Sequence, residues 1–361
     1  MSESATASAP AKTQPKAKKN RLSSGFFRFV LTRFLLIIPT VFILVTIVFF
    51  VMRATGDPIS AAMGGRLTPE ELQRRIHAAG YDRPLVVQYL DYLRGLLRGD
   101  LGTTLTDNQP VTTILTRYGA ATFELAFLSL IVALIVGIGL GRLAARRRDH
   151  AADAGIRVFA ILCYATPVFF LGLMLKLVFA VWLNVLPPSG RSSFASDMQF
   201  QRLVSPTGFY IIDAFQLGDM SVLVDVLRHA VLPALALGLL TAGVFIRLVR
   251  TNVISTYTSG YVEAARSRGV SEGRLLSKHA WRPAMIPIIT VMGMQIALML
   301  AGAVLTETTF EWKGLGFMLS QYLKQRDFVA VQGIVILIAI IVAVVNFIVD
   351  VISALIDPRV R

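Results

Sequence analysis

The chain has 361 residues, of which 36 are Lys or Arg and 22 are Asp or Glu, so its formal net charge is +14. Hydrophobic residues make up 55%, charged residues only 16%, and the mean hydropathy is +0.64. A soluble domain carries about 25% charged residues, so this composition excludes both an ordinary soluble protein and a disordered one. One cysteine excludes an intrachain disulfide, and four scattered histidines show no metal-ligand spacing, so we expect no metal site.

Residues 1–25 have a composition of their own, rich in Ser, Ala, Lys and Pro and without apolar periodicity. Such a segment buries too little apolar surface to fold, so we expect a disordered basic tail. A signal peptide is not expected, because no small-residue cleavage site follows the next apolar run.

Six apolar segments follow this tail, and each is long enough to cross a hydrocarbon core of about 30 Å as a helix. Six spans place both ends of the chain on the same side of a membrane. The third span contains Pro167. The predicted spans are approximately Phe34–Met52, Phe123–Leu140, Val158–Leu183, Ala230–Ile246, Ile286–Leu305 and Val329–Val349.

The basic residues are distributed unevenly over the segments that connect these spans. One set holds 21 Lys and Arg against 6 Asp and Glu, and comprises residues 1–33, 141–157, 247–283 and 356–361. The opposite set holds 14 residues of each sign, and comprises residues 52–120, 184–228 and 307–328. Cytoplasmic segments carry the excess of Lys and Arg, so we predict that the first set and both termini are cytoplasmic. The net charge is then a topology signal, and we expect no nucleic-acid partner.

The predicted outer segments contain some local structure. Thr68 is expected to cap a helix that starts at Pro69 and ends near Ala79. A second helix is expected at about Leu85–Leu97, and the segment 184–228 is expected to be mostly irregular.

Three charged residues lie inside or beside the predicted spans. Glu124 would open the second span, where a carboxylate complements the positive end of a helix. Lys176 can extend to the interface, and Asp350 lies near the cytoplasmic end of the sixth span. Since all three are expected close to an interface, they do not predict a proton relay.

The chain has no obvious energy source of its own. The pattern GxxxxGK[ST] does not occur, so the phosphate-binding loop of an ATPase is absent. Uphill transport would depend on an ion gradient or on ATP that another chain hydrolyses.

The segment between the fourth and fifth spans predicts a helix–turn–helix. Tyr261–Arg268 consists of good helix formers, and Gly269 ends it in a conformation that glycine adopts at little cost. Ser271 is expected to cap a second helix. Judged by its residues alone, the segment could equally be an amphipathic surface loop.

This segment resembles the Glu-Ala-Ala-x-x-x-Gly motif of ABC importer permeases, with which Glu263, Ala264, Ala265 and Gly269 are in register. In that family the loop is the coupling helix, which docks in a groove of the ATPase subunit. The resemblance implies that these four residues are coupling positions within a loop at 247–283. Three arginines are candidates to contact acidic residues of the ATPase, the alternative being topogenic charge: Arg266, Arg268 and Arg274.

Other stretches resemble the dipeptide/oligopeptide/nickel subfamily of these permeases, and together they cover nearly the whole chain after residue 25. The long first outer segment resembles that of the first of the two permeases usually found in such systems. Lys313 stands where the family usually has a proline. The matching stretches include Gly56-Asp57-Pro58, Gly99-Asp100-Leu101-Gly102, Glu307-Thr308-x-Phe310, Gly314-Leu315-Gly316, Arg326-Asp327 and Asp357-Pro358-Arg359.

The resemblance implies an all-α polytopic membrane protein with six transmembrane helices and the ABC type I importer permease fold. The permease domain would span residues 26–361, with an outer loop at 52–120 and the coupling loop at 247–283. It would be a multi-pass protein of the bacterial plasma (inner) membrane.

The function implied is that of a permease subunit, half of the translocation pathway for di- and oligopeptides. Its partners would be a second homologous permease subunit, two ABC ATPase subunits, an extracytoplasmic substrate-binding protein and the lipid bilayer. The chain would not be an enzyme and would bind no cofactor, and ATP and Mg would be bound by the ATPase subunits.

Polar residues in the later spans are weak candidates for the substrate pathway, which we expect the third to sixth spans to line. Gln295, Thr306 and Asn346 lie in or at the edge of these spans. Polar side chains also join helices by hydrogen bonds in membrane bundles, so these residues could either line the pathway or join two helices.

Other cargoes fit the same architecture, namely nickel chelates, glutathione and oligosaccharides. A different class is an ion-driven secondary transporter, which typically has inverted repeats and broken helices; the sequence indicates neither. A membrane-embedded enzyme is disfavoured because no acid/base or metal constellation is present.

Overall fold

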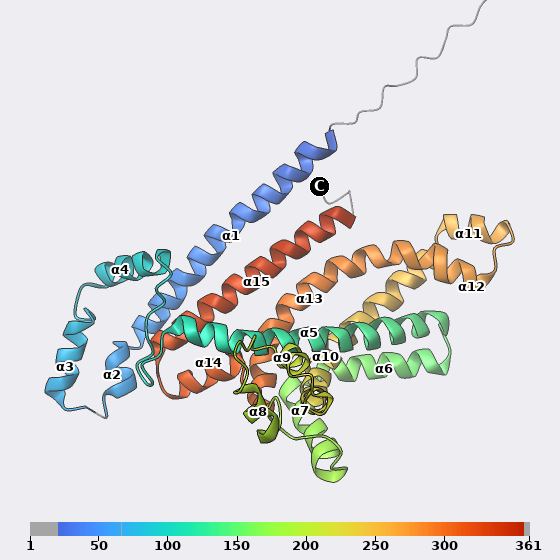
Figure 1. Ribbon diagram of the computed structural model, residues 1–361. Coiled ribbons are helices and arrows are strands. Elements are labelled where there is room, and N and C mark those ends of the chain that lie inside the picture. Colours follow the sequence, from blue (N-terminus) through green and yellow to red (C-terminus); the bar gives the residue numbers. More distant parts are fainter. Residues whose placement is uncertain (1–20, 66, 357–361) are drawn as a thin grey trace, which may run out of the picture.

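The computed structural model describes residues 21–65 and 67–356. This part of the chain is helical apart from its turns and loops and one isolated bridge between Thr103 and Pro110, so the all-α prediction is confirmed. The long helices run between the two ends of one bundle (Figure 1). We call the end with residues 258–271 the coupling-loop end, and the end with residues 55–110 the distal end.

Within residues 21–65 and 67–356, four single helices are long and apolar enough to span a membrane, and two bent helix pairs also pass this test when each pair is taken together. Counting each bent pair as one crossing gives six spans, as predicted. The single helices are α1 (Arg21–Ala54), α5 (Val111–Arg146), α10 (Met220–Tyr257) and α15 (Phe328–Ile356). The first pair consists of α6 (Ala151–Ala165) and of α7 (Val168–Leu175) with its π-helical continuation η1 (Lys176–Trp182). The second pair runs through α12 (Glu272–Arg274), the π-helical η2 (Leu275–Ala280) and α13 (Trp281–Phe310).

The third predicted span, Val158–Leu183, is not one straight helix. Its two halves meet at 109°. The break lies at Thr166, whose ψ of 128° is extended, because the ring of Pro167 disfavours helical geometry in the residue before it. Broken helices are therefore present, and their supposed absence does not argue against a secondary transporter.

Helices α5 and α10 pack closely because glycines of α5 face bulky residues of α10. A Cβ atom on Gly137 would lie 2.5 Å from the Cβ of Phe245, and one on Gly141 would lie 2.7 Å from the Cβ of Val249. Phe245 and Val249 are fully buried. Small residues allow this approach of helix backbones in membrane proteins. This contact fixes the position of α10 relative to α5, and α10 leads directly into the coupling loop.

Helix α1 packs against α15 at the edge of the bundle (Figure 1). Most of its apolar side chains are exposed, including Phe34, Ile38 and Phe42. A helix of this length and apolar character is suited to face lipid or a further membrane helix.

The distal end carries α2 (Pro58–Met63), α3 (Pro69–Ala78) and α4 (Leu85–Leu97). The Thr68 hydroxyl accepts a hydrogen bond from the Glu71 N–H, as expected of the helix cap. The two predicted helices of this segment are confirmed, and the bounds of α4 are those predicted.

The segment 184–228 is more regular than predicted. It contains α8 (Phe194–Phe200) and α9 (Tyr210–Leu217), and α10 begins at Met220 rather than at Ala230. The first turns of α10 carry polar residues, which conceal them from a search for apolar runs, but Val222 and Val226 are buried against α8 and α9. A further helix, α14 (Leu315–Lys324), precedes α15.

The expected tail lies mostly outside the described residues, because the description starts at residue 21. Helix α1 begins at Arg21 and so includes the last residues of the segment 1–25.

Candidate functional site

The predicted coupling loop, within residues 247–283, is built from α11 (Gly260–Ser267), a tight turn and α12 (Figure 1). In the turn, Gly269 has φ of +80°, and its N–H donates to the Arg266 carbonyl at 2.9 Å. Ala264 is exposed on α11 and Ala265 is half-buried. The predicted helix–turn–helix is therefore present, with its glycine in the left-handed conformation.

The second helix of the loop is continuous with a spanning helix. Ser271 occupies the N-cap position of α12, although its hydroxyl makes no capping hydrogen bond. The three-residue α12 continues through η2 into α13. Single π-helical turns are frequent at functional sites. A displacement of the loop would thus be transmitted directly to α13.

Arg266 binds within the loop. Its guanidinium donates to Glu263 and, from Nε to Oε1 at 2.8 Å, to Glu272, and it lies 5.0 Å from the centre of the Tyr257 ring. The hydrogen bond to Glu272 raises the pKa of the Arg266 guanidinium above its usual value. Arg266 therefore braces α11 against α12 and α10.

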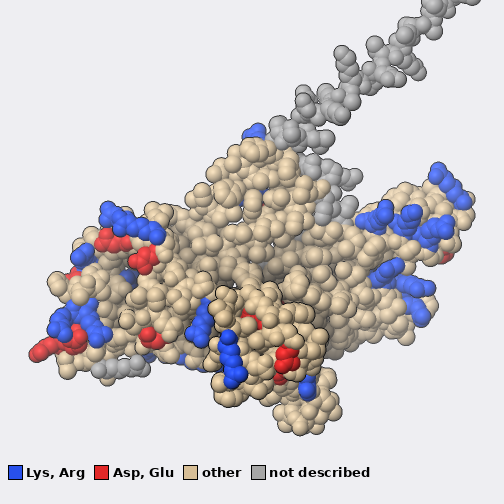
Figure 2. All heavy atoms as spheres, viewed as in Figure 1, with Lys and Arg blue, Asp and Glu red and all other residues tan. Residues whose placement is uncertain are grey.

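The other two candidate arginines are free to meet a partner. Arg268 and Arg274 are exposed, and within the described part of the chain neither side chain has a hydrogen bond or an ion pair. Figure 2 shows Lys and Arg gathered over the region of α11 and α12, while the distal end shows both signs of charge. This surface suits a partner that is acidic.

A buried ion pair joins α6 to α10 near the coupling loop. The Asp153 carboxylate is fully buried and accepts two hydrogen bonds from Arg250, at 2.6 Å from Nε and 2.7 Å from Nη2. Bidentate pairing fixes the relative orientation of the two groups. The pair is not apparent from the sequence, because its members are 97 positions apart and each looks like an ordinary loop charge.

Glu124 does not lie at a helix start, because α5 begins at Val111, so that interpretation was wrong. Its buried carboxylate accepts from Arg191 Nη2 at 2.5 Å and from the Ile211 N–H at 2.8 Å. The Arg191 guanidinium also lies 3.7 Å from the centre of the Tyr210 ring. This cluster fastens the segment before α10 to α5.

Glu307 anchors the distal end of α13. Its fully buried carboxylate accepts from the Thr122 hydroxyl at 2.6 Å and from the Phe317 N–H at 2.9 Å. Trp312, also fully buried, donates from Nε1 to the Ala121 carbonyl at 2.9 Å. In the sequence, Glu307 stands out only as part of a family motif and was expected in a loop, whereas it lies in α13.

Lys176 and Asp350 have partners within the bundle. The Lys176 ammonium donates to the Thr309 carbonyl at 3.0 Å, which joins η1 to α13. Asp350 lies 3.3 Å from Arg33, an ion pair between α15 and α1.

The three candidate pathway residues do not form one site. Gln295 and Thr306 are both on α13, and a separation of 11 residues corresponds to about 16 Å along a helix. Thr306 is buried and its hydroxyl has no hydrogen-bond partner in the described chain, whereas Gln295 is half-buried. Asn346 is exposed on α15.

Known transport proteins are similar to this chain over almost their whole length. It is 36% identical over 335 residues to the di/tripeptide transport system permease protein DppB of Pseudomonas aeruginosa, covering 92% of this chain and 98% of that protein. The dipeptide transport system permease protein DppB of Escherichia coli K12 is 37% identical with the same coverage. The glutathione transport system permease protein GsiC of Salmonella choleraesuis is 31% identical, again with 92% and 98% coverage.

A solved structure and two family models agree with these relatives. The inward-facing MetNI methionine ABC transporter has a chain of similar fold, with a TM-score of 0.50 at 14% identity, covering 68% of this chain and 97% of that one. The model of the N-terminal membrane component of binding-protein-dependent transport systems matches residues 26–125. The model of the inner membrane component of these systems matches residues 137–361. The chain therefore belongs to the family of binding-protein-dependent transport system inner membrane components, the non-enzymatic permeases of ABC transporters.

Proposed function

We propose that this chain forms half of the translocation pathway of an ATP-driven importer for di- and oligopeptides. The observation that carries this proposal is the coupling loop, a braced helix–turn–helix that continues directly into a spanning helix. The dipeptide permeases among the relatives support the cargo. The other half of the pathway is a second, homologous permease subunit.

In this proposal two ATPase subunits bind ATP and Mg and receive the coupling loop. The exposed face at Ala264 and the turn at Gly269 enter a groove of the ATPase, and Arg268 and Arg274 meet its acidic residues. The pair between Glu263 and Arg266 keeps the loop rigid. Closure of the ATPases shifts the permease between inward- and outward-facing states, because the loop contacts differ between those states.

The charge distribution supports an orientation with the coupling-loop end and both termini in the cytoplasm of a bacterium. The distal end then faces the substrate-binding protein. Gln295, Thr306 and Asn346 are retained as candidates to line the pathway or to contact the second permease.

The cargo is tested by uptake of radiolabelled dialanine in the source bacterium, with and without this gene. We expect uptake to be lost on deletion and restored by the wild-type gene. Glutathione is the second candidate, because one of the relatives is a glutathione permease. Loss of glutathione uptake with dialanine uptake unchanged would replace the proposed cargo.

A further inference from the structure

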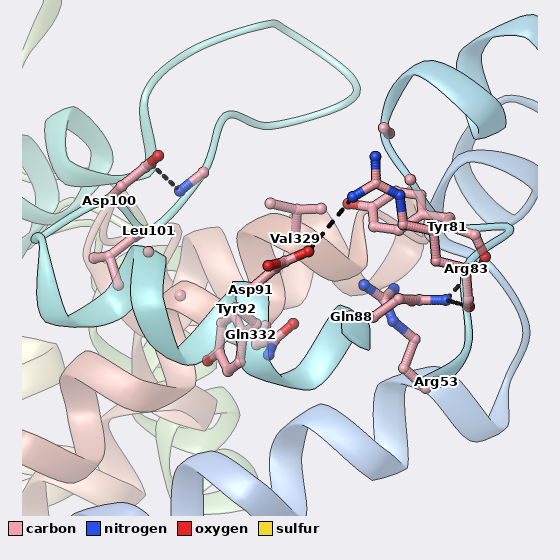
Figure 3. Close-up of a pocket in the computed structure, with 15 residues that line it drawn as sticks. Arg53, Tyr81, Arg83, Gln88, Asp91, Tyr92, Asp100, Leu101, Val329 and Gln332 are labelled. Atoms are coloured by element: carbon pink, nitrogen blue, oxygen red, sulfur yellow. Dashed lines mark hydrogen bonds and ion pairs between the residues drawn. The ribbon is translucent and has the colours of Figure 1, made fainter. Parts of the chain in front are cut away.

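A cavity of about 350 Å³ lies at the distal end, away from the coupling loop. Its walls come from α4, the last turn of α1, the turn at 79–83, the loop at 100–102 and the start of α15 (Figure 3). Small-molecule sites commonly have volumes of about 300–1,000 Å³. The cavity therefore has room for a small ligand.

Four buried polar atoms of this wall have no hydrogen-bond partner in the described chain. They belong to four side chains: Arg53 (Nε), Gln88 (Oε1), Tyr92 (OH) and Gln332 (Nε2). Gln332 itself is only 9% exposed. Buried polar groups in proteins are nearly always paired, so their concentration around one cavity indicates a missing partner.

Three of these groups are hydrogen-bond donors that lie near one another. Burial raises the pKa of Tyr92 to about 12, against the opposing effect of its neighbours Gln332 and Arg53, so its hydroxyl keeps its proton. The Arg53 guanidinium is held 4.4 Å from the centre of the Tyr81 ring. The Arg53 guanidinium beside two neutral donors, the Tyr92 hydroxyl and the Gln332 amide, suits a carboxylate, because hydrogen bonds to an ionised acceptor are strong.

The acceptors of the wall complement these donors. The Gln88 amide N–H₂ group donates to the carbonyls of Tyr81 at 2.9 Å and Arg83 at 2.8 Å, which leaves its Oε1 as a free acceptor. Asp100, on the opposite side of the cavity from Arg53 in Figure 3, accepts a hydrogen bond from the Gly102 N–H at 2.9 Å and has no ion-pair partner in the described chain.

The charges of the wall balance, which favours a zwitterion over a free anion such as phosphate. Arg83 and Asp91 pair with each other at 3.6 Å. Arg53 and Asp100 then remain, one of each sign, with no ion pair in the described residues. A ligand with a carboxylate at one end and an ammonium at the other satisfies both.

We propose that this cavity binds a short peptide in its zwitterionic form, with the terminal carboxylate on Arg53, Tyr92 and Gln332 and the terminal ammonium toward Asp100. The site would receive cargo before it enters the spans, and it rests on the proposed function only for the identity of the ligand as a peptide.

The test is a titration of the purified full-length protein in lipid nanodiscs with dialanine, without ATP, by isothermal calorimetry. Dialanine amide lacks the carboxylate, and N-acetyl-dialanine lacks the ammonium. We expect dialanine to bind and both analogues and inorganic phosphate to bind at least about tenfold more weakly, since hydrogen bonds to charged groups carry that much affinity. Equal binding of dialanine and its amide, or no binding of dialanine, would overturn the proposal.

Matched variants locate the binding. Tyr92→Phe removes only the hydroxyl and keeps the ring stacked on Phe49. Tyr89→Phe is the control, because Tyr89 also contacts Phe49 but its hydroxyl is paired with Thr46 at 2.7 Å, away from the cavity. We expect Tyr92→Phe to weaken dialanine binding by about tenfold and Tyr89→Phe to leave it unchanged.

A Tyr92→Phe protein with undiminished binding would overturn the assignment of this cavity. Binding without ATP is measured separately from uptake. If the wild-type protein does not bind dialanine although cells take up peptides normally, the site alone is rejected. If the wild-type protein binds dialanine although the gene supports no peptide uptake in cells, the proposed cargo alone is rejected.

Discussion

Gly269 and Gly273 lie in the same exposed loop and differ in one backbone angle. A Cβ on either glycine would meet no atom within 4 Å, but only Gly269 has a positive φ, +80°. An L-residue in that conformation costs about 1–2 kcal/mol. Steric fit therefore does not distinguish the two positions, and conformational strain does.

We predict that Gly269→Ala distorts the turn and uncouples transport, while Gly273→Ala is neutral or slightly stabilising. Alanine in a helical position gains about 0.5–1 kcal/mol over glycine. The measurement is the amount of ATP hydrolysed per peptide taken up, in proteoliposomes that contain the whole importer. A Gly269→Ala importer as well coupled as the wild type would contradict the role given to this turn. Asparagine tolerates a positive φ better than alanine, so Gly269→Asn should be better coupled than Gly269→Ala.

At the scale of elements, the contact between α5 and α10 depends on which face of α5 a glycine occupies. Gly137 faces α10, whereas Gly139 is exposed and a Cβ there would meet no atom within 4 Å. An added methyl group at Gly137 would overlap Phe245, so the helices would have to separate.

We predict that Gly137→Ala destabilises the protein by about 1–3 kcal/mol, the usual cost of overpacking a core. Gly139→Ala, two residues away, should leave stability unchanged or raise it slightly. The check is the midpoint of thermal unfolding of both variants in detergent. Equal midpoints would show that α5 and α10 are not in close contact at this position.

At the scale of the whole molecule, the two ends of the bundle differ in charge and should lie on opposite sides of the membrane. Cys163 is the only cysteine and is buried, so a Cys163→Ala background is suitable for labelling. Val204, between α8 and α9 in the predicted outer segment 184–228, is 100% exposed, and Ser271 is exposed in the coupling loop.

We predict that an impermeant thiol reagent added to intact cells labels a cysteine at Val204 and not one at Ser271. Both positions should react after the membrane is permeabilised, which controls for accessibility. Labelling of the Ser271 position alone in intact cells would reverse the proposed orientation.

The sequence by itself determined those features that depend on neighbouring residues. Runs of apolar residues predicted six spans, the Thr68 cap predicted the first distal helix, a second helix was predicted at about Leu85–Leu97 before Gly99, and Gly269 predicted a turn. Each follows from the local preferences of a few consecutive residues, and the family motifs are likewise local strings.

Only the tertiary structure decided how charged residues pair across the bundle. Glu124 and Arg191 are 67 positions apart and Asp153 and Arg250 are 97 apart, so no local pattern connects them. The four unpaired groups of the distal cavity likewise come from three helices that are far apart in the sequence, α1, α4 and α15. Burial of a polar atom is a property of the whole fold, because it depends on what every other element leaves uncovered, and that is the physical reason why the sequence alone did not reveal these sites.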